Sequence, residues 1–132
     1  MKLIKIIIIL LISFNTSLIA NSNDDLQNIL NEGGKLIFIR HAYAPGGGDP
    51  DNFDISNCAS QRNLNKEGIE QAITIGKFFL KNHMEQNLVL SSEWCRCKQT
   101  AKYAFNDYKT KSFLNSFFSQ KFAHKKTNQI KE

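Results

Sequence analysis

Cysteine and histidine are both scarce in this chain, with three residues of each among 132. Cys95 and Cys97 are separated by a single residue, which is too close for a zinc pair, and no further Cys or His flanks them. The sequence also has no internal repeat and no low-complexity segment beyond its first twenty residues. It therefore predicts no metal site and no array of repeats.

Long apolar runs are absent except for Ile6 to Ile12, which is too short to favour a membrane-spanning helix. Lys2 and Lys5 precede this run, and the region ends in small and apolar residues at Ala20. The order of basic, apolar and small residues is typical of a secretory signal peptide cleaved after Ala20. Leu18 is large for its place in a cleavage signal, so an uncleaved anchor is the alternative.

Residues 1–20 are thus predicted to be a signal peptide and residues 21–132 a single domain of an exported, periplasmic protein. Residues 21–94 hold six Lys and Arg against ten Asp and Glu, whereas residues 95–132 hold nine against two. The lysines are scattered rather than blocked, which indicates a solvated face. We therefore expect no nucleic-acid partner and, after cleavage, no stable membrane span, and the oligomeric state stays open.

In an exported protein the three cysteines predict one disulfide and one odd thiol. Cys58 is expected to pair with either Cys95 or Cys97, and the sequence leaves this choice open.

Hydrophobic periodicity and capping residues predict an alternation of strands and helices. The expected strands are 35–39 and 87–92, with a short extended segment at 113–114. The expected helices are one capped at 23–25 and ended by Gly33-Gly34, one at 66–81 capped by Asn65, one at 93–105 capped by Ser92, and a weak one at 119–131. This order is typical of an α/β fold with right-handed crossovers and a parallel sheet.

The expected strand 35–39 carries four consecutive apolar residues and leads directly into Arg40 and His41. Such a run is typical of a strand buried on both faces of a parallel sheet, and ligands bind at the carboxyl ends of these strands. A guanidinium beside an imidazole suits a phosphate group, because Arg offers a planar fork of donors and His can act as a nucleophile. The alternative is a strand end with two surface residues.

The second expected strand also ends in polar residues, Ser91 and Ser92, and Arg96 falls in the first turns of the following helix. The free N–H groups at a helix N-terminus favour an anion, and a guanidinium adds a charged fork there. Arg96 alone reads as an exposed helix residue. Together with Arg40 and His41 at a neighbouring strand end, it predicts a phosphate site.

Three segments, LIFIRHA, QRNLNKEGIEQA and VLSSEWCRCKQTA, resemble in sequence and order the signature segments of the histidine phosphatase superfamily, also called phosphoglycerate mutase-like. The resemblance covers roughly residues 35 to 105, with Ala42 in place of the usual Gly, as in some small exported bacterial members. It implies a three-layer α/β core around a parallel sheet. That core would be incomplete at the C-terminus, since the chain ends before the family's last strands and helices.

The resemblance implies a phosphatase that hydrolyses phosphomonoesters through a phosphohistidine intermediate. His41 would be the nucleophile, and Arg40 and Arg96 would hold the phosphoryl oxygens of a small phosphorylated substrate, with no metal or organic cofactor. Nearby guanidinium groups also favour the neutral imidazole that attack requires. Arg62, beside the loop at 42–62, would add a phosphate contact, and its alternative is a surface residue before a helix. A loop of this length is usually functional.

Two features of the family are not identifiable in this sequence. Neither His83 nor His124 follows an apolar strand as the family's second catalytic histidine does, and Leu114-Asn115-Ser116 stands where some members carry the general acid. The acidic residues left as alternatives for that role are Asp49, Asp51 and Asp54. The competing functions are a phosphate-binding or interaction module without turnover, and a mutase, which an exported location without sugar phosphates disfavours.

Overall fold

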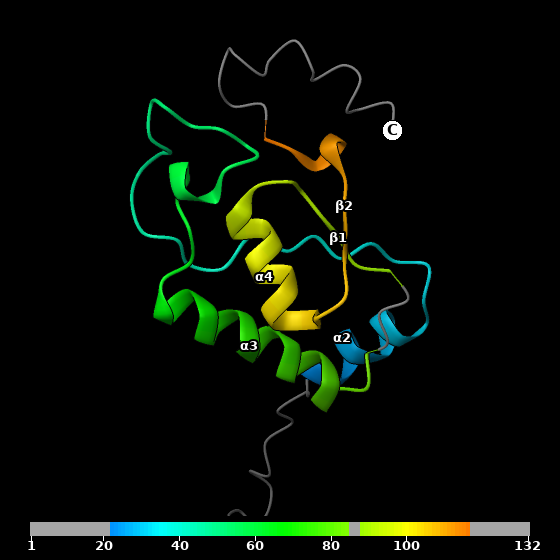
Figure 1. Ribbon diagram of the computed structural model, residues 1–132. Coiled ribbons are helices and arrows are strands. Elements are labelled where there is room, and N and C mark those ends of the chain that lie inside the picture. The colour runs from blue at the N-terminus through cyan, green and yellow to red at the C-terminus, as the bar shows by residue number, and fades with distance from the viewer. Residues whose placement is uncertain (1–21, 85–87, 117–132) are drawn as a thin grey trace, which may run out of the picture. The chain divides into compact units, whose positions relative to one another are not determined.

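The structure is a computed structural model, and it describes residues 22–84 and 88–116. The chain divides into two units, residues 1–33 and 34–132 (Figure 1). In the first unit α2 spans Ser22–Asn31, and Gly33 just after it has a φ of 74°, which confirms the short helix and its glycine end. The predicted signal peptide and the weak helix at 119–131 lie outside the described residues.

The longest described helix, α3, spans Lys66–Lys81, as the sequence predicted. Asn65 caps it, because its side-chain oxygen accepts a hydrogen bond of 2.9 Å from the N–H of Gly68. Its buried residues recur every three or four positions, as one helix face requires: Gly68, Ala72, Gly76 and Phe79.

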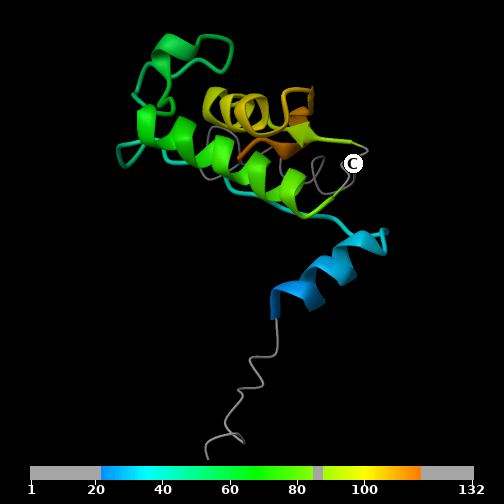
Figure 2. The ribbon, with the colours of Figure 1, turned by 90° about the horizontal axis from the view of Figure 1, so that it is seen from below.

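The second helix of this unit, α4, spans Cys95–Phe105 and runs beside α3 (Figure 2). The two helices approach closely because residue 76 is glycine: a Cβ there would collide with the backbone carbonyl of Ala104. Phe79 and Phe105 pack edge to face at 5.1 Å between ring centroids. The predicted cap was wrong by two residues. Trp94 is the N-cap, and Ser92 supports it only by accepting a bond from the Trp94 N–H.

Two short strands, β1 at Leu90–Ser91 and β2 at Lys109–Thr110, pair in parallel on either side of α4 in the chain. The amide of Lys109 donates to Val89 at 2.9 Å, and that of Lys111 donates to Ser91 at 2.8 Å. The expected strand 87–92 is thus confirmed at its end. The expected extended segment at 113–114 was wrong, since a 3₁₀ turn, η2, spans Ser112–Leu114 and the strand comes before it.

The expected strand at residues 35–39 is not a strand in the structure. A strand needs a neighbouring strand for its backbone, and residues 35–39 pair with neither β1 nor β2, which form a sheet with each other. Leu36 and Phe38 are 85% and 83% exposed. Two strands are too few to test the predicted three-layer core, which stays a prediction.

A small core lies between α3 and the segment that follows His41. It is built from Ala42, Ala44, Leu64 and Ala72, with Ile69 against them. Gly68 allows this packing, because a Cβ there would collide with the carbonyl of Tyr43. None of the described helices has the length and apolar character to cross a membrane.

Candidate functional site

Thr100, on α4, joins the segment of His41 to the helix turn of Arg96. The N–H of Ala42 donates to the Thr100 hydroxyl at 2.9 Å, and that hydroxyl donates to the carbonyl of Arg96 at 2.7 Å. Ala42 and Thr100 are buried, at 2% and 6% exposure. Two buried hydrogen bonds therefore tie together the two predicted parts of the site, which lie far apart in the sequence.

The imidazole of His41 is half-buried, and its Nδ1 lies 2.7 Å from the carbonyl oxygen of Ala42. A carbonyl can only accept, so Nδ1 carries a hydrogen, and in the neutral ring Nε2 holds the lone pair. Burial lowers the pKa of His41 below 6.5, and the charges of Arg96, Arg40 and Arg62 lower it further, against the raising effect of the Ala42 bond. The ring is thus neutral near pH 7.

Arg96 is buried, and its guanidinium has two defined neighbours. Nη1 lies 3.0 Å from both carboxylate oxygens of Asp49, and the guanidinium carbon lies 4.5 Å from the centroid of the Trp94 ring. The Nε of Arg96 is buried and has no hydrogen-bond partner among the described residues. Arg96 is therefore not the exposed helix residue of the alternative interpretation, and its part in a phosphate site stays a prediction.

Arg62 is half-buried and holds the glycine-rich loop. Its Nη1 donates to the carbonyls of Ala44, at 2.9 Å, and Gly46, and its backbone N–H donates to Asp49 at 2.9 Å. Residue 46 must be glycine, because its φ is 100° and a Cβ would lie 3.2 Å from the Arg62 side chain. The Nε of Arg62 is also buried without a partner among the described residues.

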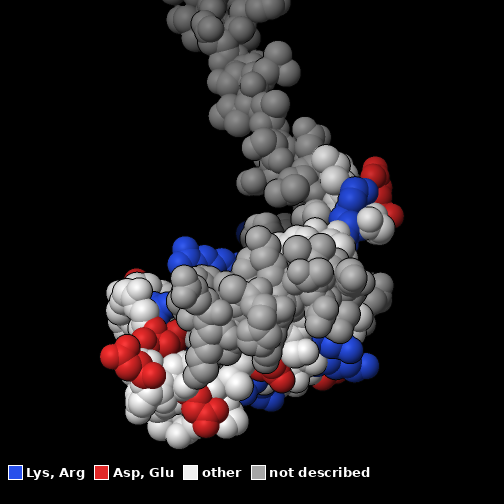
Figure 3. All heavy atoms as spheres, turned by 90° about the horizontal axis from the view of Figure 1, so that it is seen from above, with Lys and Arg blue, Asp and Glu red and all other residues white. Residues whose placement is uncertain are grey.

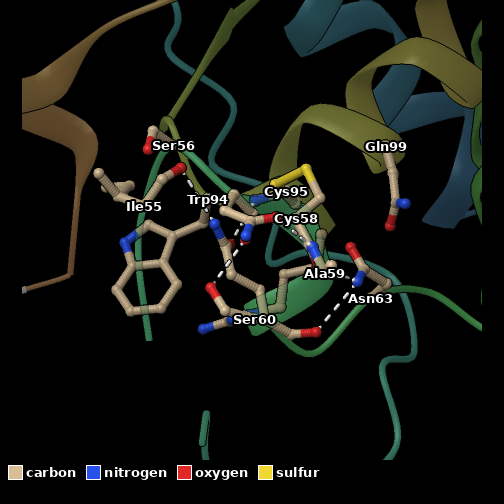
Figure 4. The surroundings of a disulfide bond; sticks show 12 residues. Ile55, Ser56, Cys58, Ala59, Ser60, Asn63, Trp94, Cys95 and Gln99 are labelled. Atoms are coloured by element: carbon tan, nitrogen blue, oxygen red, sulfur yellow. Dashed lines mark hydrogen bonds between the residues drawn. A yellow bond between two sulfur atoms is a disulfide. The ribbon is translucent and has the colours of Figure 1, made fainter. Parts of the chain in front are cut away.

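The loop at 42–62 is fastened to the start of α4 by a disulfide between Cys58 and Cys95 (Figure 4). This confirms one of the two expected pairings and leaves Cys97 as the odd thiol. Beside the disulfide, Gln61 accepts a bond from the N–H of Cys95 and donates to the carbonyl of Asp54, both at 2.9 Å. The loop is thus held beside Arg96 by one covalent link and one hydrogen bond to Cys95, and the bond to Asp54 fixes the Gln61 side chain within the loop.

Comparison of the chain with protein-family models, with curated proteins and with solved structures finds no match. The resemblance to the histidine phosphatase superfamily therefore stays a prediction, carried by the three sequence segments.

Sequence reasoning missed the part played by glutamine side chains in building the site. Gln99 accepts from the N–H of Leu64 at 2.9 Å, and Gln71 accepts from the N–H of Tyr43 at 2.8 Å. These backbone amides lie at the start of the loop and just after its end. Gln99 and Gln71 lie in the segments that carry the resemblance, which is the only signal in the sequence that could have singled them out.

Other predicted residues are spread more widely. Arg40 is exposed, and its charge reaches His41. His83 is exposed just after α3, and Asn115 pairs with Glu93 at 2.6 Å. His124 lies outside the described residues.

The three loop aspartates differ in their surroundings. Asp49 accepts bonds on both oxygens, Asp54 accepts from the N–H and hydroxyl of Ser56, and Asp51 is exposed. No group of three His, Cys, Asp or Glu side chains in the described part of the chain is placed to hold a metal ion.

The charged side chains visible in Figure 3 are interspersed rather than gathered by sign. The marked concentration of positive charge in the described residues is instead local, with Arg40, Arg62 and Arg96 all acting on His41. A neutral imidazole amid guanidinium groups with free N–H donors is an arrangement that suits an anion with several oxygens.

Proposed function

We propose that this chain is an exported phosphatase of the histidine phosphatase type, which hydrolyses phosphomonoesters through a phosphohistidine intermediate. The observation that carries the proposal is the setting of His41. Its Nδ1 faces the Ala42 carbonyl, so that Nε2 is the lone-pair nitrogen, and burial with three nearby arginines lowers its pKa. A nucleophilic imidazole has to be neutral, and this setting favours the neutral form.

In the proposed reaction, Nε2 of His41 attacks phosphorus while the bond to the ester oxygen breaks. The ester oxygen leaves with the electron pair of the broken bond and takes a proton from water, and an aryl ester reacts readily because phenolate can leave without being protonated. Water then attacks the phosphohistidine, releasing inorganic phosphate and restoring the imidazole. The guanidinium groups of Arg40, Arg62 and Arg96 stabilise the negative charge that spreads over the equatorial oxygens during both steps.

Export is supported by two features of the chain. The N-terminal residues have the order of a signal peptide, and the Cys58–Cys95 disulfide is of the kind that persists in oxidising compartments such as the periplasm. An exported phosphatase would act on phosphomonoesters outside the cytoplasm. A mutase is disfavoured there, because an exported location lacks the sugar phosphates that it would interconvert.

The test is hydrolysis of 4-nitrophenyl phosphate by the purified chain, measured by the absorbance of the nitrophenolate that is released. His41→Ala should abolish turnover, and the incubated wild type should carry an acid-labile phosphoryl group on His41, detected by mass spectrometry. His83→Ala is the matched control, since this histidine is exposed at the end of α3, and it should retain the wild-type rate. Turnover that survives His41→Ala would refute the proposal.

The alternative is a phosphate-binding module without turnover. One observation favours it: His83 is the only other histidine among the described residues, and it lies exposed beyond the last turn of α3. A chain that binds inorganic phosphate, loses that binding in Arg96→Ala and never hydrolyses the aryl ester would support this alternative.

A further inference from the structure

Among the described residues, Arg96 forms a salt bridge with one acidic side chain, that of Asp49. The two side chains are buried to a similar extent. The exposed fractions of the two side chains are 6% for Asp49 and 8% for Arg96. Both carboxylate oxygens lie 3.0 Å from the same atom, Nη1. A buried ion pair costs desolvation of both ions, so its retention in a small domain calls for a role beyond stability.

Asp49 is itself held from two sides. Its Oδ1 also accepts the backbone N–H of Arg62 at 2.9 Å, and Arg62 in turn holds the carbonyls of Ala44 and Gly46. The carboxylate is therefore attached to the loop backbone rather than free to swing with its own side chain.

The guanidinium of Arg96 is restrained on its flat face as well as at Nη1. The guanidinium lies over the Trp94 ring, and Phe53 stacks on the Trp94 ring at 4.3 Å between centroids. The plane and the rotation of the guanidinium are both set by these contacts, while the buried Nε has no partner among the described residues. Among the described residues, the donors of Nη2 and Nε are therefore left for an anion.

We propose that Asp49 is a positioning residue that holds Nη1 of Arg96 and so aims the remaining guanidinium donors at a phosphoryl group. The inference rests on the proposed function only in assigning phosphate to Arg96, and it does not require turnover. It also assigns Asp49 a different role from proton donation, because both of its oxygens are used as acceptors.

The affinity for phosphate tests the inference, because loss of positioning and loss of a negative charge at Asp49 change that affinity in opposite directions. In Asp49→Asn the amide oxygen can keep the bonds of Oδ1, but the amide NH₂ then faces Nη1, a donor against a donor. If Asp49 aims the guanidinium, Asp49→Asn weakens binding of inorganic phosphate about tenfold, the value of one charged hydrogen bond. If Asp49 only offsets positive charge, its removal strengthens binding.

The matched control is Asp107→Asn, which removes the same charge from an exposed aspartate in the turn after α4. Titration calorimetry with inorganic phosphate on the full chain compares the three proteins, and circular dichroism checks that each is folded. We expect weaker binding in Asp49→Asn alone. Binding by folded Asp49→Asn that equals or exceeds wild type would overturn the inference.

A measurement on the wild type covers the case in which Asp49→Asn does not fold. The ¹³C signal of the Asp49 carboxyl group should stay in place when phosphate saturates the protein, while the Nε–H signal of Arg96 shifts. A carboxyl signal that moves to the position of a solvated aspartate would mean that phosphate displaces Asp49, and would overturn the positioning role. If the wild type shows both of these NMR results but does not hydrolyse the aryl ester, the phosphatase proposal alone is refuted.

Discussion

Replacing Thr100 by valine should separate the segment of His41 from the helix of Arg96 while changing the shape of the core very little. The hydroxyl of Thr100 accepts the N–H of Ala42 at 2.9 Å and donates to the carbonyl of Arg96 at 2.7 Å. Valine has nearly the same volume but neither function. Thr100→Val therefore leaves the Ala42 N–H, in a residue that is 2% exposed, without its partner.

The expected cost follows from this burial. A buried donor that loses its acceptor costs about 1–3 kcal/mol, and we expect about 2 kcal/mol because Ala42 is almost wholly shielded from water. In a domain of this size, such a loss lowers Tm by on the order of 10 °C. The assay is urea unfolding followed by tryptophan fluorescence, since Trp94 is buried in the native state.

The control is Thr74→Val on the exposed face of α3, where the hydroxyl also donates to a backbone carbonyl, that of Glu70, at 2.8 Å. This change removes the same group without burying an unpaired N–H, and its effect should stay within about 0.5 kcal/mol. Equal midpoints for Thr100→Val and Thr74→Val would refute the reasoning that the Ala42 bond joins the two halves of the site.

Two further predictions concern the loop and the imidazole. Cys58→Ser should lower the free energy of unfolding by about 4 kcal/mol through loss of a cross-link between residues 37 positions apart, whereas Cys97→Ser, which removes only the odd thiol, should leave the urea midpoint unchanged. Because the pKa of His41 is lowered in the folded protein, the unfolded chain takes up a proton first as the pH falls through about 6.5. The free energy of unfolding should therefore decrease from there down to the pKa of the folded state. His41→Gln should flatten that part of the stability–pH curve.

Local features of the sequence were enough to predict α3 and the end of α2. Asn65 supplies the cap of α3, and apolar residues at helical spacing supply its buried face, so that the information lies within one segment. Strand 35–39 failed for the opposite reason. Its apolar run resembles a buried strand, but burial depends on neighbours from elsewhere in the chain, and 35–39 pairs with neither β1 nor β2.

For the site, the sequence by itself indicated His41, Arg40 and Arg96 as chemically suited to phosphate, because their types and their places after apolar runs are local properties. Only the tertiary structure decided how they are held. The pairing of Asp49 with Arg96 spans 47 residues, and that of Ala42 with Thr100 spans 58. No local pattern marks which carboxylate or hydroxyl will meet which donor over such separations, since the choice is made by the packing of α3, α4 and the loop at 42–62.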